Sequence, residues 1–104
     1  MKIAIAITSS GKDADVDKHG ARAPYYLLLN TDSGSSEILP NPVTLAERRA
    51  GPQAAAFLVS QGVDKVVAGD FGPKFRVELE GNNITCTVMA GSAMEVVAGL
   101  SNQM

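Results

Sequence analysis

The residues best suited to chemistry gather in one long connection, residues 8–26, which holds the only histidine of the chain, His19. Imidazole is a common metal ligand, and the free group titrates near neutral pH. No paired spacing such as CxxC or HxxxH occurs in the sequence, so a preformed zinc site is not predicted. A solitary histidine is more often an ordinary loop residue, and this alternative stays open beside the interpretation of His19 as a ligand.

The same connection carries three aspartates at alternate positions, Asp13, Asp15 and Asp17. They superficially resemble a calcium-binding loop, in which the sixth position is glycine and the twelfth is glutamate. Here those two positions hold Lys18 and Pro24, so the aspartates are predicted to form a solvated acidic loop. The chain also lacks GxGxxG, Walker-type and GxSxG motifs and any nucleophile–base pair, so we expect a binding protein and not an enzyme.

Composition limits the partners and the compartment. Nine Lys and Arg stand against eleven Asp and Glu, and the net charge of −2 gives no basic face for nucleic acid. One cysteine, Cys86, excludes an intrachain disulfide framework, and a buried, inert thiol is favoured over a ligand inside its predicted strand. The first residues lack the apolar core of a signal peptide, and no run approaches the roughly 18 apolar residues of a membrane span. We therefore expect a cytoplasmic protein with no membrane and no nucleic-acid partner.

The elements that position these residues alternate in type along the chain. Strands are predicted over 2–8, 25–32, 36–39, 63–69 and 84–89, and helices over 51–62, over 72–81 and from 92 onward. The alternating second half implies parallel strands with right-handed crossovers, while the hairpin of the second and third strands makes one strand antiparallel. We expect a single domain, residues 1–104, with a mixed five-stranded sheet between helices and the first strand at its centre.

Ligands of open α/β sheets bind outside the carboxyl ends of the parallel strands. Three segments reach that edge here, residues 8–24, 69–74 and 90–94. The last two lead into predicted helix N-termini, where Gly72 and Gly91 allow close backbone approach and free N–H groups favour an anion. Positive charge is available from Lys12, Lys18, Arg22 and Lys74. The residues alone therefore indicate an anion or cofactor site, with glycines that merely form turns as the alternative.

Four short motifs occur in register along the chain: HGARAPYY at 19–26, GPQAA at 51–55, GVD at 62–64 and AGDFGP at 68–73. Together they resemble the dinitrogenase iron–molybdenum cofactor biosynthesis family, the group of NifX-like proteins and related cofactor carriers, over essentially the whole chain. The resemblance implies a ribonuclease-H-like α/β/α fold with a mixed five-stranded sheet of order 3-2-1-4-5, in which strand 2 is antiparallel. This order agrees with the elements derived above.

The resemblance also implies the binding and carriage of an anionic metal–sulfur cluster during metallocofactor biosynthesis. The cluster is the iron–molybdenum cofactor or its precursor, and some related proteins carry a molybdenum–copper sulfide cluster. Such a polyanion would be stabilised by N–H groups at the two helix N-termini, with His19 as the metal ligand. The candidate cofactor-binding residues are His19, Arg22, Gly69, Gly72, Lys74, Gly91 and Ser92. The implied partners are donor and acceptor proteins of metallocluster assembly, and the implied state is a monomer or weak homodimer.

The family motif is usually His-Phe-Gly-Arg-Ala, whereas Gly20 and Ala21 follow the histidine in this chain. This departure motivates a second hypothesis, a protein-interaction or regulatory domain that kept the fold after losing the cluster. A third hypothesis is a small hydrolase on the same scaffold. That class needs several acidic residues around two metal ions, and Asp70 is the one carboxylate placed at the end of a parallel strand, so we rank it last.

Overall fold

The predicted order of strands and helices is confirmed by the computed structural model, which describes residues 1–11, 13–43 and 50–101. The elements are β1 (Lys2–Ile7), β2 (Tyr25–Asn30), β3 (Ser36–Pro40), α1 (Ala50–Ser60), β4 (Lys65–Ala68), α2 (Pro73–Gly81), β5 (Thr85–Val88) and α3 (Ala93–Ser101). In the part of the chain that is described, no helix has the length and apolar character needed to cross a membrane.

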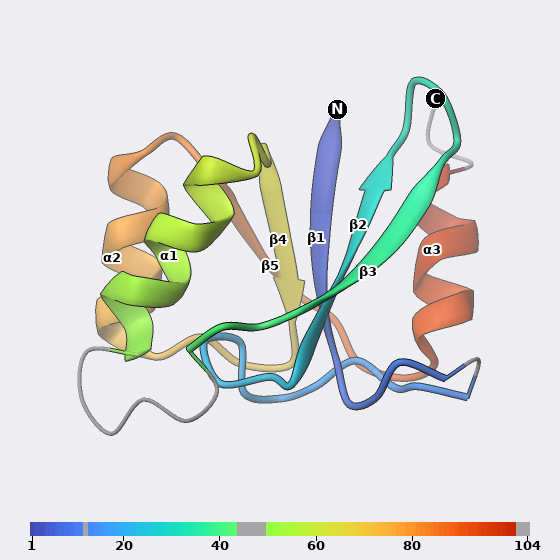
Figure 1. Cartoon of the computed structure of the whole chain (residues 1–104), viewed down its shortest axis with the longest axis horizontal. Coiled ribbons are helices and arrows are strands. Elements are labelled where there is room, and N and C mark those ends of the chain that lie inside the picture. Colours follow the sequence, from blue (N-terminus) through green and yellow to red (C-terminus); the bar gives the residue numbers. More distant parts are fainter. Residues whose placement is uncertain (12, 44–49, 102–104) are drawn as a thin grey trace.

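The described strands form one mixed sheet of order β3-β2-β1-β4-β5, as expected (Figure 1). The central strand β1 is antiparallel to β2, with Ile5 opposite Leu27, and parallel to β4, with Ile5 opposite Val67. β5 is parallel to β4, and β3 is antiparallel to β2 after a turn in which Gly34 has a φ of +75°. The parallel strands therefore end at the same edge of the sheet, the lower edge in Figure 1.

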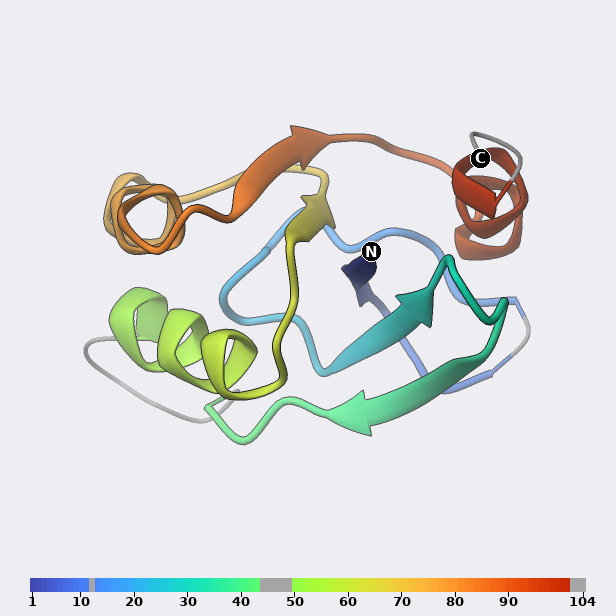
Figure 2. The ribbon, with the colours of Figure 1, turned by 90° about the horizontal axis from the view of Figure 1, so that it is seen from above.

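Helices cover both faces of the sheet, with α1 and α2 on one side and α3 on the other (Figure 2). Side chains of β1 alternate between the two faces of the sheet, so each helical layer packs against a different set of them. Ala4 and Ala6 belong to the buried cluster of the α1–α2 side, whereas Ile5 belongs to that of the α3 side, with Val96. Because Ala4 and Ala6 offer only methyl groups to the first side, larger side chains such as Phe75 fill the space there.

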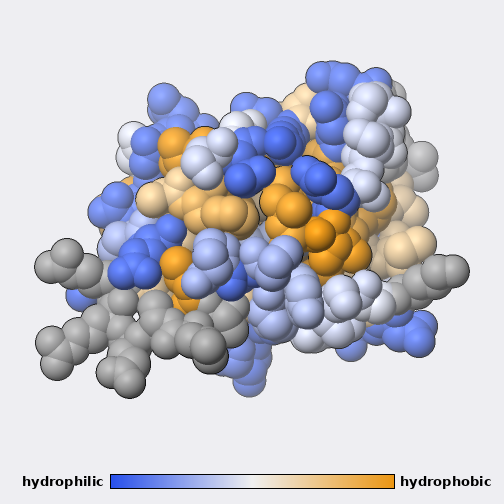
Figure 3. Space-filling view, viewed as in Figure 1, coloured by the Kyte–Doolittle hydropathy of each residue, from blue (hydrophilic) through white to orange (hydrophobic). Residues whose placement is uncertain are grey.

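The outer strands are the exposed part of the sheet. Ile38 of β3 and Val88 of β5 are both more than a third exposed. Figure 3 shows a hydrophobic area on the face turned to the viewer, to the right of α1. The helices therefore protect the centre of the sheet around β1, while its edges stay in contact with solvent.

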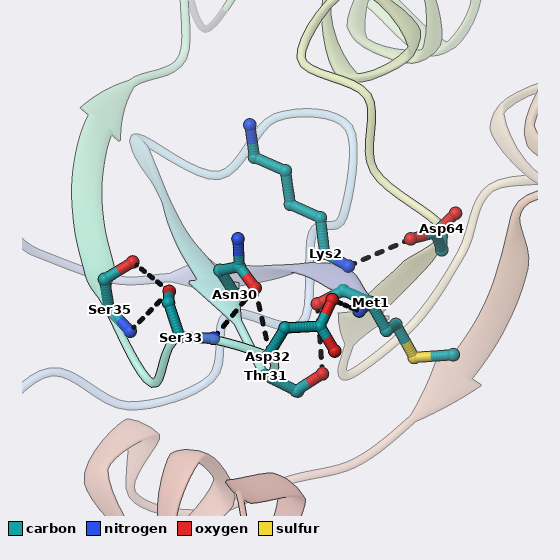
Figure 4. A network of polar contacts seen from close by, with 8 residues as sticks. All are labelled: Met1, Lys2, Asn30, Thr31, Asp32, Ser33, Ser35 and Asp64. Carbon is teal, nitrogen blue, oxygen red and sulfur yellow. Dashed lines mark hydrogen bonds and ion pairs between the residues drawn. The ribbon is translucent and has the colours of Figure 1, made fainter.

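The upper edge of the sheet is fixed by polar contacts (Figure 4). The amino group of Met1 pairs with Asp32 at 3.0 Å, and the N–H of Lys2 donates to the carboxylate of Asp64 at 2.9 Å. The side-chain oxygen of Asn30 accepts the N–H of Asp32 at 2.9 Å. These contacts join the start of β1 to the hairpin turn and to the residues before β4, and they leave the opposite edge for the site.

Candidate functional site

The carboxyl edge of the sheet carries a pocket of about 430 Å³. Its walls are residues 18–22, in the later part of the connection after β1, and the first turns of α1 and α2, which lie at the lower left of Figure 1. The described lining residues are 18–22, 50–52, 70 and 72–75. Four of the predicted site residues therefore come together here: His19, Arg22, Gly72 and Lys74.

The first turns of α1 and α2 meet at this pocket, and Gly51 permits their contact. A Cβ atom on Gly51 would lie 2.9 Å from the backbone nitrogen of Phe75, a distance that any larger residue would have to relieve. α2 begins with Gly72 as its N-cap and Pro73 in its first turn, and no side chain caps it. Because the N–H groups of an uncapped first turn lack partners and the helix dipole adds positive potential, this end of α2 favours an anion.

The ring of Phe75, in α2, packs under residues 18–22, which we call the histidine loop. Phe75 is 1% exposed and stacks on Phe71, with 5.8 Å between the ring centroids. The ring lies so close to Gly20 that a Cβ atom there would be 2.9 Å from Cε2 of Phe75. The packing therefore requires glycine at position 20, and the loop has an aromatic anchor without the phenylalanine of the His-Phe-Gly-Arg-Ala motif.

Two buried polar side chains hold the rest of the loop. The hydroxyl of Tyr26 donates to the carbonyl of Gly20 at 2.5 Å, and the amide of Asn41 donates to the carbonyls of Ala21 and Ala23, both at 2.9 Å. Burial raises the pKa of the Tyr26 phenol well above its ordinary value, so the hydroxyl keeps its proton and remains a donor. The loop is thus fixed from β2 and from the residue that follows β3.

His19 is held by Asp17. One carboxylate oxygen of Asp17 accepts the backbone N–H of His19 at 2.7 Å and lies 3.3 Å from its ring Nδ1. The side chain of Asp17 is 14% exposed, whereas that of His19 is 64% exposed. The prediction of a solvated loop is therefore wrong for Asp17, because its contact with the second residue along the chain, an Asx turn, draws it into the fold. Asp13 and Asp15 are exposed, as predicted.

The pocket is locally basic in a chain that is acidic overall. Its described lining includes the cations Lys18, Arg22 and Lys74 against one carboxylate, Asp70, whereas the whole chain has a net charge of −2. Asp70 was not among the predicted binding residues. Lys12, the fourth cation named from the sequence, lies outside the described residues.

The other three predicted site residues do not line this pocket. The N–H of Gly69 donates to the carbonyl of Asp17 at 2.9 Å, so Gly69 supports the histidine loop from behind. Gly91 and Ser92 precede α3 on the opposite side of the sheet, where the carbonyl of Gly91 accepts the N–H of Val16 at 2.9 Å. The structure therefore does not bring the N-termini of α2 and α3 to one pocket, because these helices cover opposite faces. The start of α1 as described takes the place that was expected for α3.

The metal-binding side chains available in the pocket are few. Within the described residues, no group of three or more His, Cys, Asp or Glu is placed to hold a metal ion. His19 and Asp70 are the side chains of these types in the described lining. Cys86 is half-buried against the cluster of the α1–α2 side and not fully buried as predicted. Its partial burial raises the pKa of the thiol. A bound metal cluster would therefore depend on charge and on very few direct ligands.

A comparison with protein families shows which family this chain belongs to. The model of the family described as dinitrogenase iron–molybdenum cofactor matches residues 1–103. The chain belongs to this family. Membership supports a role in iron–molybdenum cofactor biosynthesis, as the motifs of residues 19–26 and 68–73 implied.

Several solved structures share the fold of this chain. The NMR structure of a NifB candidate from Thermotoga matches with a TM-score of 0.81 at 25% identity, covering 98% of this chain and 88% of the other. The apo form of the orange protein from Desulfovibrio gigas gives 0.85 at 24% identity, with the same coverage. A candidate dinitrogenase from Methanocaldococcus jannaschii gives 0.67 at 11% identity, again over 98% and 88% of the two chains. At under 25% identity, these last two structures show the fold alone. The search of curated proteins found no match.

Proposed function

We propose that this protein binds an anionic metal–sulfur cluster and carries it between a donor and an acceptor protein during metallocofactor biosynthesis, without catalysing a reaction. The cargo is the iron–molybdenum cofactor, its precursor or a related molybdenum-containing cluster, and the whole chain acts as one domain. The observation that carries the proposal is the pocket itself, where an exposed imidazole, three cations and an uncapped helix N-terminus lie together. Family membership gives the chemical class of the cargo.

The residues present fit such a cargo by charge. A sulfide-rich cluster is polyanionic, and Lys18, Arg22 and Lys74 supply positive charge around the pocket while the first turn of α2 supplies N–H donors. The imidazole of His19 is the exposed nitrogen ligand, since 64% of the side chain is open to solvent. Asp70 opposes the anion, so it limits how tightly the cluster is held.

The same features suit a carrier better than a permanent site. A structural zinc site surrounds its metal with four protein ligands, whereas the described lining of this pocket offers His19 and Asp70. A cluster that is held by one imidazole and by charge keeps most of its metal positions open. The ligands of an acceptor protein can then bind the open metal positions before His19 dissociates. Transfer of the cluster requires this order.

The alternative is an interaction or regulatory domain that has lost the cluster. Its motivation was the replacement of the motif's Phe-Gly by Gly20 and Ala21. Because Phe75 packs against Gly20, the histidine loop is anchored without the phenylalanine of the motif. Among the described residues, this packing weakens the motivation for the alternative.

The test is anaerobic addition of a molybdenum–sulfur or iron–sulfur cluster, followed by gel filtration and absorption spectroscopy of the protein fraction. We expect a visible-absorbing complex in the wild type, and weaker binding in His19→Ala and Lys74→Gln. Lys2→Gln is the matched control, because Lys2 starts β1 at the opposite edge of the sheet (Figure 4). Equal binding by wild type and His19→Ala would remove His19 from the site. No uptake at all, with a stable metal-free complex in a pull-down, would support the interaction domain instead.

A further inference from the structure

We propose that Asp17 is the positioning residue of the site: its carboxylate holds the imidazole of His19 in the tautomer with the proton on Nδ1, and so keeps the lone pair of Nε2 for the metal. This inference rests on the proposed function, in which His19 is the ligand. The family motif begins at the histidine and gives no role to the residue two positions before it.

The geometry selects the ring nitrogen. Oδ1 of Asp17 lies 2.7 Å from the backbone nitrogen of His19 and 3.3 Å from its ring Nδ1. A carboxylate only accepts hydrogen bonds, so the nitrogen facing it has to carry the proton. The backbone contact anchors the carboxylate and the longer ring contact sets the tautomer. Because Nδ1 faces Asp17 and the side chain of His19 is 64% exposed as a whole, Nε2 is the ring nitrogen left for a ligand.

Asp17 is itself held by the sheet. Its N–H donates to the carbonyl of Ala6 in β1 at 2.8 Å, and its carbonyl accepts the N–H of Gly69 at 2.9 Å, directly after β4. The peptide of Asp17 therefore bridges the ends of two neighbouring parallel strands. Since its side chain is only 14% exposed, the carboxylate has little freedom to turn away from the ring. The sheet therefore holds Asp17, and Asp17 holds His19. Gly69 contributes to this support through its hydrogen bond to Asp17.

The consequence for a ligand is direct. Neutral imidazole in water prefers the proton on Nε2, which blocks the nitrogen that His19 would offer to a metal. Histidine ligands in metal sites commonly donate their other N–H to a carboxylate, and loss of that partner typically costs about 10–100-fold in metal affinity. Asp17 supplies this partner before any cluster binds, so the site is prepared in the metal-free protein.

The test uses the fact that the chain contains a single histidine. Protein labelled with ¹⁵N in histidine gives one pair of ring nitrogen signals, and their chemical shifts report the tautomer at a pH where the ring is neutral. We expect the Nδ1–H tautomer to predominate in the wild type and the Nε2–H tautomer in Asp17→Ala. Asp15→Ala is the matched control, because it removes the same charge from an exposed position of the same loop and should leave the tautomer unchanged.

A second variant separates positioning from folding. Asp17→Asn keeps a side-chain oxygen for the backbone N–H of His19, and its neutral amide accepts more weakly from Nδ1, so the Nδ1–H population should still fall. A predominant Nε2–H tautomer in the wild type overturns the proposal, and so does an unchanged tautomer in both Asp17 variants.

Binding of an iron–sulfur cluster that has an open iron position, under anaerobic conditions, gives the second readout. We expect affinity to fall about 10–100-fold in Asp17→Ala and to stay at the wild-type value in Asp15→Ala. If the wild type binds no probe, the proposed function fails, while the tautomer measurement in metal-free protein still decides the role of Asp17. If the wild type binds the probe and Asp17→Ala binds it equally well, the role of Asp17 in binding is overturned.

Discussion

Replacing Gly20 by alanine should destabilise the protein by forcing the histidine loop away from α2. A Cβ atom at this position would lie 2.9 Å from Cε2 of Phe75, 3.1 Å from the carbonyl oxygen of Asp70 and 3.2 Å from Cβ of Ala68. The ring cannot yield cheaply, because Phe75 is 1% exposed and stacked on Phe71. The other two neighbours are the backbone of Asp70, two residues after β4, and the buried methyl group of Ala68, the last residue of β4.

Overpacking of this kind typically costs about 1–3 kcal/mol. For a domain of this size, each kcal/mol lowers the melting temperature by roughly 4–8 °C, so Gly20→Ala should lower it by roughly 4–24 °C. Gly81→Ala is the matched control. Gly81 also belongs to the α2 region, a Cβ atom there meets nothing within 4 Å, and alanine in a helix is favoured over glycine.

A double-mutant cycle identifies the contact that is responsible. Phe75→Leu alone leaves a cavity and is destabilising, but it also removes the ring edge that the new methyl group meets. The two changes should therefore be less damaging together than the sum of their separate costs, by about 0.5–3 kcal/mol. Urea unfolding of the four proteins gives the coupling energy. A neutral Gly20→Ala, or costs that simply add, would refute the view that Phe75 anchors the loop from α2.

Two further predictions concern the buried groups that hold the loop. Asn41→Ala should lower the free energy of unfolding, measured in urea, by about 1–3 kcal/mol, because two buried carbonyls lose their donor. Asn30→Ala at the hairpin turn should lower it by less, and equal losses in the two variants would contradict this prediction. The raised pKa of Tyr26 predicts a pH effect whose sign follows from the unfolded chain, which loses the phenol proton above about pH 10 while the folded protein keeps it. The stabilising contribution of Tyr26 is complete below pH 10 and declines above it, so the wild type should lose stability relative to Tyr26→Phe by up to about 1.4 kcal/mol per pH unit. A difference between the two proteins that stays constant from pH 8 to pH 11 would contradict the burial of the phenol.

The element order was predictable because local signals agreed with one another. Alternating Ile and Ala in β1 indicated a strand covered on both faces, and the pairs Pro52–Gly62 and Pro73–Gly81 marked the start and end of two helices. The structure confirms these elements to within two residues at each end. Such signals depend on neighbouring residues only, so they are present in the sequence itself.

The composition of the site was predictable only in part. Sequence order places the N-termini of α2 and α3 at the carboxyl edge but does not say which face of the sheet each helix covers, and so α3 was expected where α1 lies. Phe75 reads as an ordinary core residue of its helix, because nothing local shows that its ring reaches Gly20. Asp17 could have been found, since an aspartate two residues before His19 is the spacing of an Asx turn.

The central claim is that an anionic cluster binds in the pocket between the histidine loop and the first turns of α1 and α2. The most direct measurement is a ¹H–¹⁵N spectrum of the protein titrated anaerobically with tetrathiomolybdate, a diamagnetic molybdenum–sulfur anion. We predict saturable shifts of the backbone amides in residues 18–22, 50–51, 70, 72 and 74–75, and none at Gly91 and Ser92 on the α3 side. Shifts that are absent, or that centre on Gly91 and Ser92, would contradict the account.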